Sequence, residues 1–89
     1  MTPDPLSEAA GLLARGDWAA AHAIVQAHAL LPHAAWAHGI VHLLEGDLDN
    51  ARYWYARAGR AFPHDPAAGP ELEALQRALA ARGPFLDRG

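Results

Sequence analysis

The sequence has 89 residues, of which 52% are hydrophobic, so it is long enough for one small domain with its own core. It contains no cysteine, which excludes disulfides and thiol chemistry. The formal charge is -3, with seven arginines, no lysine and ten acidic residues. This balance argues against a nucleic-acid binder, which usually carries a basic surface. Neither a signal peptide nor a long apolar run is found, so we expect no membrane association and a cytoplasmic location.

Alanine supplies 22 residues and β-branched residues are few, which predicts an all-α fold. Helix start and stop signals divide the chain into an antiparallel array of five helices. The predicted helices are 5–15, 18–30, 33–45, 48–62 and 70–82, with Asp4, Asp17 and Asp47 as N-caps and Gly16 and Gly46 as stops. Pro5, Pro32 and Pro70 open the first, third and fifth helices. The proline-rich segment 63–70 is predicted to be a loop. In the tail beyond Pro84, Phe85 and Leu86 are candidates for docking on a neighbour.

Apolar residues recur at helical spacing and predict which faces form the core. The predicted core residues are Trp36, Ile40 and Leu43 in the third helix, Leu48, Ala51, Tyr55, Ala58 and Phe62 in the fourth, and Leu72, Leu75 and Leu79 in the fifth. In the fifth helix this face leaves four polar residues for water: Glu71, Gln76, Arg77 and Arg82.

A shift of thirty residues superimposes the two halves of the chain. It places Gly16-Asp17 on Gly46-Asp47, and it places Leu6, Leu13, Ala21 and Val25 on Trp36, Leu43, Ala51 and Tyr55. Two helical hairpins, each broken by Gly-Asp, are typical of a helical repeat. The pattern resembles the tetratricopeptide repeat (TPR), whose positions are filled here by Trp36, Gly46, Asp47, Ala51, Tyr55, Ala58 and Pro63.

This resemblance covers about the first two-thirds of the chain. The repeat here has a period of thirty residues, which is shorter than the family's period of about 34. The first repeat also departs from the family pattern, because Leu6 stands in place of the Trp and His28 stands in place of the second Ala. It implies a single TPR-like domain, with hairpins at about 5–30 and 33–62 and a cap at about 70–82 over the open end of the solenoid.

The stretch from Trp36 to Arg60 carries a longer pattern. Its residues are Trp36, His38, His42, Glu45, Gly46, Asp47, Asn50, Ala51, Tyr53, Trp54, Tyr55, Arg57, Ala58, Gly59 and Arg60. This pattern is similar to the signature W-x-H-x-x-x-H-x-x-E-G-D-x-x-N-A-x-Y-W-Y-x-R-A-G-R of a family of short, uncharacterised bacterial and fungal proteins. The resemblance implies no particular activity.

His38 and His42 are four residues apart, so their rings lie on one side of the predicted helix. This is the histidine spacing of helical H-E-x-x-H zinc sites, but Gly39 stands where the general base would be, which excludes a metalloprotease. His22 faces the same space if the hairpins stack. Three imidazoles then form a candidate metal site for zinc, nickel or copper. The alternative is an interior cluster hydrogen-bonded to carbonyls or to Glu45.

The run Tyr53-Trp54-Tyr55 points in three directions on a helix, so one face cannot bury all three rings. Tyr55 belongs to the core stripe, Trp54 is expected to pack on the fifth or the first helix, and Tyr53 is expected to be exposed. A candidate surface for a protein partner consists of Tyr53, Trp54, Arg57 and Arg60. In the alternative, the aromatic rings hold the hairpin and the cap together. The two arginines either bind an anionic ligand or are solvated residues favoured by the helix dipole.

Nothing in the sequence supports a catalytic mechanism. Glu45, Asp47 and Asp49 form a small acidic cluster at the turn, in which Asp47 and Asp49 are interpreted as helix-capping residues. Ser7 has no visible base. We therefore predict a small cytoplasmic TPR-like binding or scaffold module that is not an enzyme. It would bind a protein partner or self-associate, because two repeats and a cap bury little core. The alternative is a metal sensor or metal-dependent enzyme that uses the three histidines.

Overall fold

A computed structural model of the chain describes residues 4–81, and within this range it contains five helices and no strand. The helices are α1 (Pro5–Ala14), α2 (Trp18–Ala27), α3 (Ala34–Glu45), α4 (Leu48–Ala58) and α5 (Ala68–Ala81). The predicted all-α fold is confirmed. Among these helices none is both long enough and apolar enough to cross a membrane. The predictions for Arg82, the Gly83-Pro84 stop and the tail with Phe85 and Leu86 lie outside the described residues.

The two Gly-Asp turns have the same geometry. Gly16 and Gly46 both adopt a left-handed backbone, with φ of 80° and 88°, which glycine reaches without steric cost. The N–H groups of Asp17 and Asp47 each donate to a carbonyl five residues earlier at 2.9 Å. Each Asp side chain then accepts the N–H three residues later at 3.3 Å, as an N-cap. The thirty-residue repeat is therefore present in the local structure of the turns.

The fourth helix ends earlier than predicted. It stops at Ala58 instead of Phe62, because Gly59 adopts a left-handed φ of 71° and the Arg60 N–H donates to the Tyr55 carbonyl at 3.0 Å. This is a glycine C-cap, which satisfies carbonyl groups at the end of the helix.

Two further helix ends differ from the prediction by more than one residue. The second helix stops at Ala27, and segment 28–31 turns instead, ahead of Pro32. Leu31 precedes that proline, and the proline ring disfavours the helical conformation at the residue before it. The fifth helix begins at Ala68, two residues before Pro70. Proline is tolerated there because first-turn N–H groups have no acceptor within the helix.

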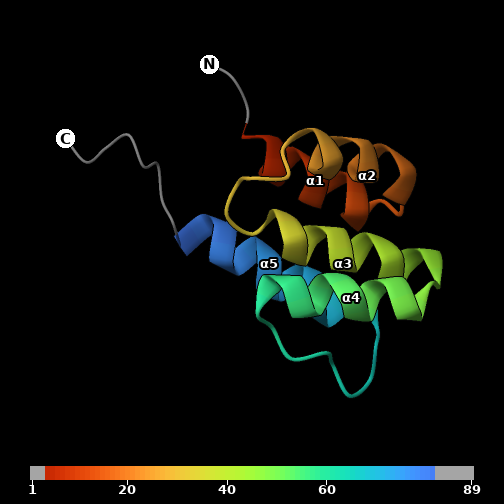
Figure 1. Ribbon diagram of the computed structural model, residues 1–89. Helices are drawn as coiled ribbons and strands as arrows, with labels where there is room; N and C mark the ends of the chain where they lie inside the picture. Colours follow the sequence, from red (N-terminus) through yellow and green to blue (C-terminus); the bar gives the residue numbers. More distant parts are fainter. Residues whose placement is uncertain (1–3, 82–89) are drawn as a thin grey trace.

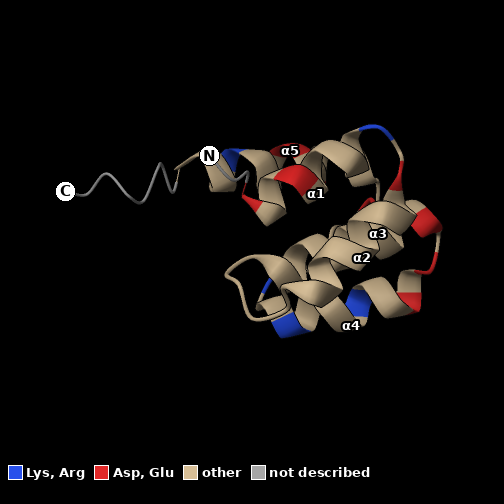
Figure 2. Ribbon diagram, turned by 90° about the horizontal axis from the view of Figure 1, so that it is seen from above, with Lys and Arg blue, Asp and Glu red and all other residues tan. Residues whose placement is uncertain are grey.

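The helices pack as two hairpins with a covering helix. α1 and α2 form the first hairpin, α3 and α4 form the second, and α2 packs on α3 (Figure 1). α5 lies against α1 and α3, the first helices of both hairpins (Figure 2). α5 therefore covers a face made by α1 and α3. The repeat pattern had predicted a cap over the open end of the solenoid instead. This arrangement leaves α2 and α4 on the opposite side of α3, and the candidate site forms there.

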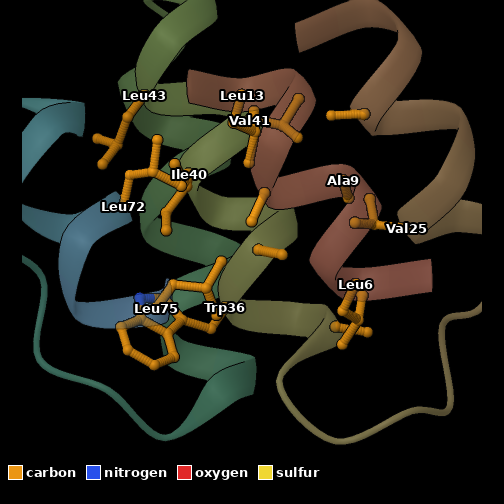
Figure 3. Close-up of a cluster of buried hydrophobic side chains, with 14 of the residues drawn as sticks. Leu6, Ala9, Leu13, Val25, Trp36, Ile40, Val41, Leu43, Leu72 and Leu75 are labelled. Carbon is orange, nitrogen blue, oxygen red and sulfur yellow. The ribbon is translucent and has the colours of Figure 1, made fainter. Parts of the chain in front are cut away.

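The core runs along the contact of α1, α3 and α5 (Figure 3). Its largest fully buried side chains are Tyr55, Leu6, Leu13, Ile40, Leu75, Val25 and Val41. Most predicted core residues are buried. Ala58 and Phe62 are only partly buried, and Leu48 is 36% exposed. The burial of Leu48 was wrongly predicted, because this residue opens α4 at the outer end of the hairpin.

The sequence predicted that Glu71 faces water, because it lies on the polar face of the fifth helix. In the structure Glu71 is half-buried. Its carboxylate accepts hydrogen bonds from the Tyr55 hydroxyl at 2.6 Å and from Trp36 Nε1 at 3.2 Å. Burial of the phenol and this hydrogen bond raise the pKa of Tyr55 far above its usual range. The contacts tie α5 to both helices of the second hairpin. Gln76 and Arg77 are exposed, as predicted.

The close approach of α3 and α4 can be tested by replacing two glycines, one at this contact and one away from it. A Cβ on Gly39 would lie 2.5 Å from Cδ1 of Tyr55, a buried ring held by its hydrogen bond. We expect Gly39→Ala to lower the free energy of unfolding by about 1–3 kcal/mol through overpacking. A Cβ on Gly11, in α1, would meet no other side chain within 4 Å. Gly11→Ala should therefore raise stability by about 0.5–1 kcal/mol. Urea unfolding followed by circular dichroism measures both, and equal stabilisation by the two changes would contradict this packing.

Candidate metal centre

Three histidines from two helices meet on the side of α3 that α5 leaves free. His22 lies in the middle of α2, and His38 and His42 lie one turn apart on α3. The ring centroids are 4.7 Å apart for His22 and His38, 5.3 Å for His22 and His42, and 5.1 Å for His38 and His42. His38 and His42 are buried and His22 is half-buried. The structure thus brings together the three residues that the sequence singled out.

The donor atoms are close enough to hold a metal ion. Nε2 of His22 and Nε2 of His38 are 3.0 Å apart, and one ligand atom from each of the three histidines lies within 4.8 Å of the others. Tetrahedral zinc, with Zn–N bonds of about 2.0–2.1 Å, places its nitrogen ligands about 3.3–3.4 Å apart. Each separation therefore has to change by no more than about 1.5 Å for the three nitrogens to bind one ion.

Glu45 fixes the orientation and tautomer of His42. The Nδ1–H of His42 donates to the Glu45 carboxylate at 2.7 Å. The other ring nitrogen, Nε2, then keeps its lone pair for a ligand. A carboxylate behind an imidazole is the usual support of a histidine ligand. The hydrogen bond to Glu45 was also part of the alternative expectation, a cluster without metal.

A second group could also hold a cation, but its geometry favours another role. His42, Glu45 and Asp47 offer ligand atoms within 4.8 Å of one another. Asp47, however, caps α4 through the N–H and the side chain of Asn50. Glu45 is exposed and holds His42. These residues are better explained as a helix cap and a support for the imidazole than as an independent site.

Trp54 covers the histidine cluster from α4. Its indole stacks on the ring of His38, with 3.8 Å between centroids and 9° between planes. The expectation that Trp54 packs on the fifth or the first helix was wrong. The reason is that α5 lies on the other side of α3, so this face of α4 meets the histidines instead. The stack fixes the plane of one candidate ligand, and no spacing rule in the sequence pointed to it.

Burial, together with the nearby His22 and His42, lowers the pKa of His38 from 6.5 to about 4. Near neutral pH this imidazole is therefore uncharged. An uncharged ring is the form that binds a metal, since a proton and a metal compete for the same lone pair.

The predicted partner surface divides into two parts. Tyr53 is 53% exposed, and Arg57 lies over the rings of Tyr53 and Trp54 at 5.8 and 5.3 Å. Arg60 lies over Trp36, 3.4 Å from the ring centroid. Both arginines are exposed, but each rests on an aromatic ring and is not fully solvated.

The arrangement offers three imidazoles, a carboxylate that orients one of them, and an indole that holds another. Such a set suits zinc, nickel or copper and leaves a fourth coordination position for water or another ligand. No protein-family model, curated protein or solved structure matches the chain, so the site is interpreted from its own geometry.

Proposed function

We propose that this protein binds a divalent transition metal through His22, His38 and His42. The observation that carries the proposal is the convergence of the three rings, with two Nε2 atoms 3.0 Å apart. Without a metal, the rings are held by hydrogen bonds between His22 and His38 and between His42 and Glu45. A metal ion would replace the first of these bonds by coordination from three rings that already lie together, and it would leave the bond to Glu45 in place.

Nitrogen donors without any thiolate favour zinc, nickel or copper over calcium or magnesium, which prefer oxygen ligands. With three protein ligands the ion keeps an open position, which supports a metal sensor, a carrier or a metal-dependent enzyme. Glu45, the carboxylate at the site, is engaged with His42. Binding or sensing is therefore the function that we favour over catalysis.

A solution test is isothermal titration of zinc and nickel into metal-free protein. We expect one ion per chain for the unmodified protein, and affinity reduced more than about 100-fold in the His38→Ala, His42→Ala double variant, because loss of supporting residues alone costs about 10–100-fold. His64→Ala is the control, since His64 is exposed and outside the cluster. Equal binding by all three proteins, or binding by none, would end the proposal.

Glu45 supplies a finer test of the same site. Replacing it by glutamine keeps a polar side chain of the same shape but removes the charge that holds His42. We expect zinc affinity to fall by about 10–100-fold, as for other residues that support a metal ligand. Glu8→Gln, at an exposed position on α1, removes the same charge and should change nothing. Equal affinities for the two variants would show that Glu45 does not support a metal ligand.

A second candidate, a TPR-like binding or scaffold module in the cytoplasm, is favoured by one observation. Leu30 is 99% exposed and its neighbour Leu31 38% exposed, in the loop between α2 and α3. Exposed apolar side chains of this kind support contact with a second copy of the chain or another protein. If the chain self-associates through them, light scattering at high concentration should show a dimer that Leu30→Ser dissociates. A monomer at every concentration would count against self-association.

A further inference from the structure

A cavity of about 400 Å³ lies where the α2–α3 loop, the start of α3 and the end of α4 meet. Its wall includes His33, Trp36, Arg57, Gly59 and Arg60. None of the three clustered histidines lines it, so it is separate from the metal centre. Basic residues gather at this end of α4 and acidic ones at the end where α4 begins (Figure 2). The volume is within the range of small-molecule sites.

The two arginines of this cavity form no ion pair with a carboxylate of residues 4–81. Within residues 4–81, the side-chain ion pairs are His42 with Glu45 and Arg52 with Asp49. Arg60 is placed by Trp36, and Arg57 by Tyr53 and Trp54. Aromatic rings orient a guanidinium without neutralising it. Although the chain has a net charge of -3, two arginines without an ion pair among residues 4–81 thus line one concave surface.

The start of α3 adds to the positive potential. His33 occupies the N-cap position with a left-handed φ of 73° and makes no side-chain cap, whereas Asp residues cap α1, α2 and α4. Ala35 and Trp36, in the first turn of α3, form part of the cavity wall. An uncapped helix start carries a partial positive charge. An Asp at position 33 would cancel part of it.

We propose that this cavity binds a small molecule that carries a phosphate group. A phosphate dianion matches the charge of two guanidinium groups, and arginine binds phosphate oxygens through two parallel hydrogen bonds. Carboxylates share this oxyanion chemistry with a single negative charge per group. Experiment can therefore distinguish phosphates from carboxylates. We expect the dianionic phosphate to bind more tightly.

The experiment follows backbone amides of metal-free protein by ¹H–¹⁵N NMR during titration with inorganic phosphate, glycerol phosphate and acetate at constant ionic strength. The amides of Ala35, Trp36 and Gly59 should shift with both phosphates. Arg57→Gln and Arg60→Gln should each raise the dissociation constant about tenfold or more, because a charge-assisted hydrogen bond is lost. Arg77→Gln, at an exposed position on α5 outside the cavity, removes the same charge and should leave it unchanged.

Each remaining outcome decides the proposal. Equal binding by all variants, or no shift of the cavity amides with either phosphate, overturns it. Tighter binding of acetate than of phosphate overturns the phosphate assignment. If Arg60→Gln unfolds the chain by releasing Trp36, Arg57→Gln decides, since Arg57 is exposed and lies over exposed Tyr53. The His38→Ala, His42→Ala double variant should keep its phosphate binding, so failure of the metal proposal and failure of this one are distinguishable.

Discussion

Replacing Trp36 by alanine is expected to lower the free energy of unfolding by about 3–5 kcal/mol, the usual range for a large aromatic side chain in a core. Trp36 is 3% exposed and lies on the face of α3 that meets α5. Its Nε1–H donates to Glu71, and the guanidinium of Arg60 lies over its ring. The change therefore removes core volume and leaves two polar partners without their contact.

Trp36→Phe separates these effects. It keeps most of the buried apolar surface and removes the indole N–H, so the expected loss is about 1 kcal/mol for the hydrogen bond together with a small packing term. Urea unfolding of the three proteins gives the comparison. A loss below about 1 kcal/mol for Trp36→Ala would mean that α3 is rotated relative to the packing described above.

Lowering the pH from 7 to 4 is expected to remove about 3 kcal/mol from the stability of the metal-free protein through His38. The pKa of this buried imidazole falls from 6.5 to about 4 on folding. Between these pH values His38 binds a proton in the unfolded chain but not in the folded chain, so acid favours unfolding. The stabilisation is complete above the unfolded pKa and is lost as the pH falls toward the folded one.

Urea unfolding at a series of pH values, in the presence of a chelator, measures this dependence. His38→Gln should flatten the curve between pH 6.5 and 4, the unfolded and folded pKa values of His38. His64→Gln, at an exposed loop position, should keep the slope of the unmodified protein. Identical slopes for all three proteins would show that protonation of His38 does not destabilise the folded protein.

The candidate site was largely accessible from the sequence because local rules govern it. The four-residue spacing of His38 and His42 puts them on one side of a helix, and the thirty-residue repeat puts His22 on the helix that packs there. The capping Asp residues and the Gly-Asp turns fixed most helix starts in the same way. Gly59 also carried a local signal, but the apolar spacing that continues through Ala58 to Phe62 predicted a longer helix.

The position of α5 could not be predicted from such rules. Its apolar stripe shows that one face is buried, but any apolar surface of the hairpins satisfies that pattern. Two consequences followed for the expected contacts. Glu71, assigned to water, accepts hydrogen bonds from Trp36 and Tyr55, and Trp54, assigned to α5 or α1, stacks on His38. Both depend on contacts between residues far apart in sequence, which periodicity within one helix does not encode.

The measurement that tests the metal proposal most directly is a crystal structure of the zinc-loaded protein, with anomalous scattering recorded at the zinc edge. We expect one strong peak between α2 and α3, about 2.0–2.1 Å from nitrogens of His22, His38 and His42. The ring of Trp54 should remain stacked on His38, and the Nδ1 of His42 should still donate to Glu45. A peak only at exposed residues such as His28, His64 or Asp49, or no peak at all, would contradict the proposal.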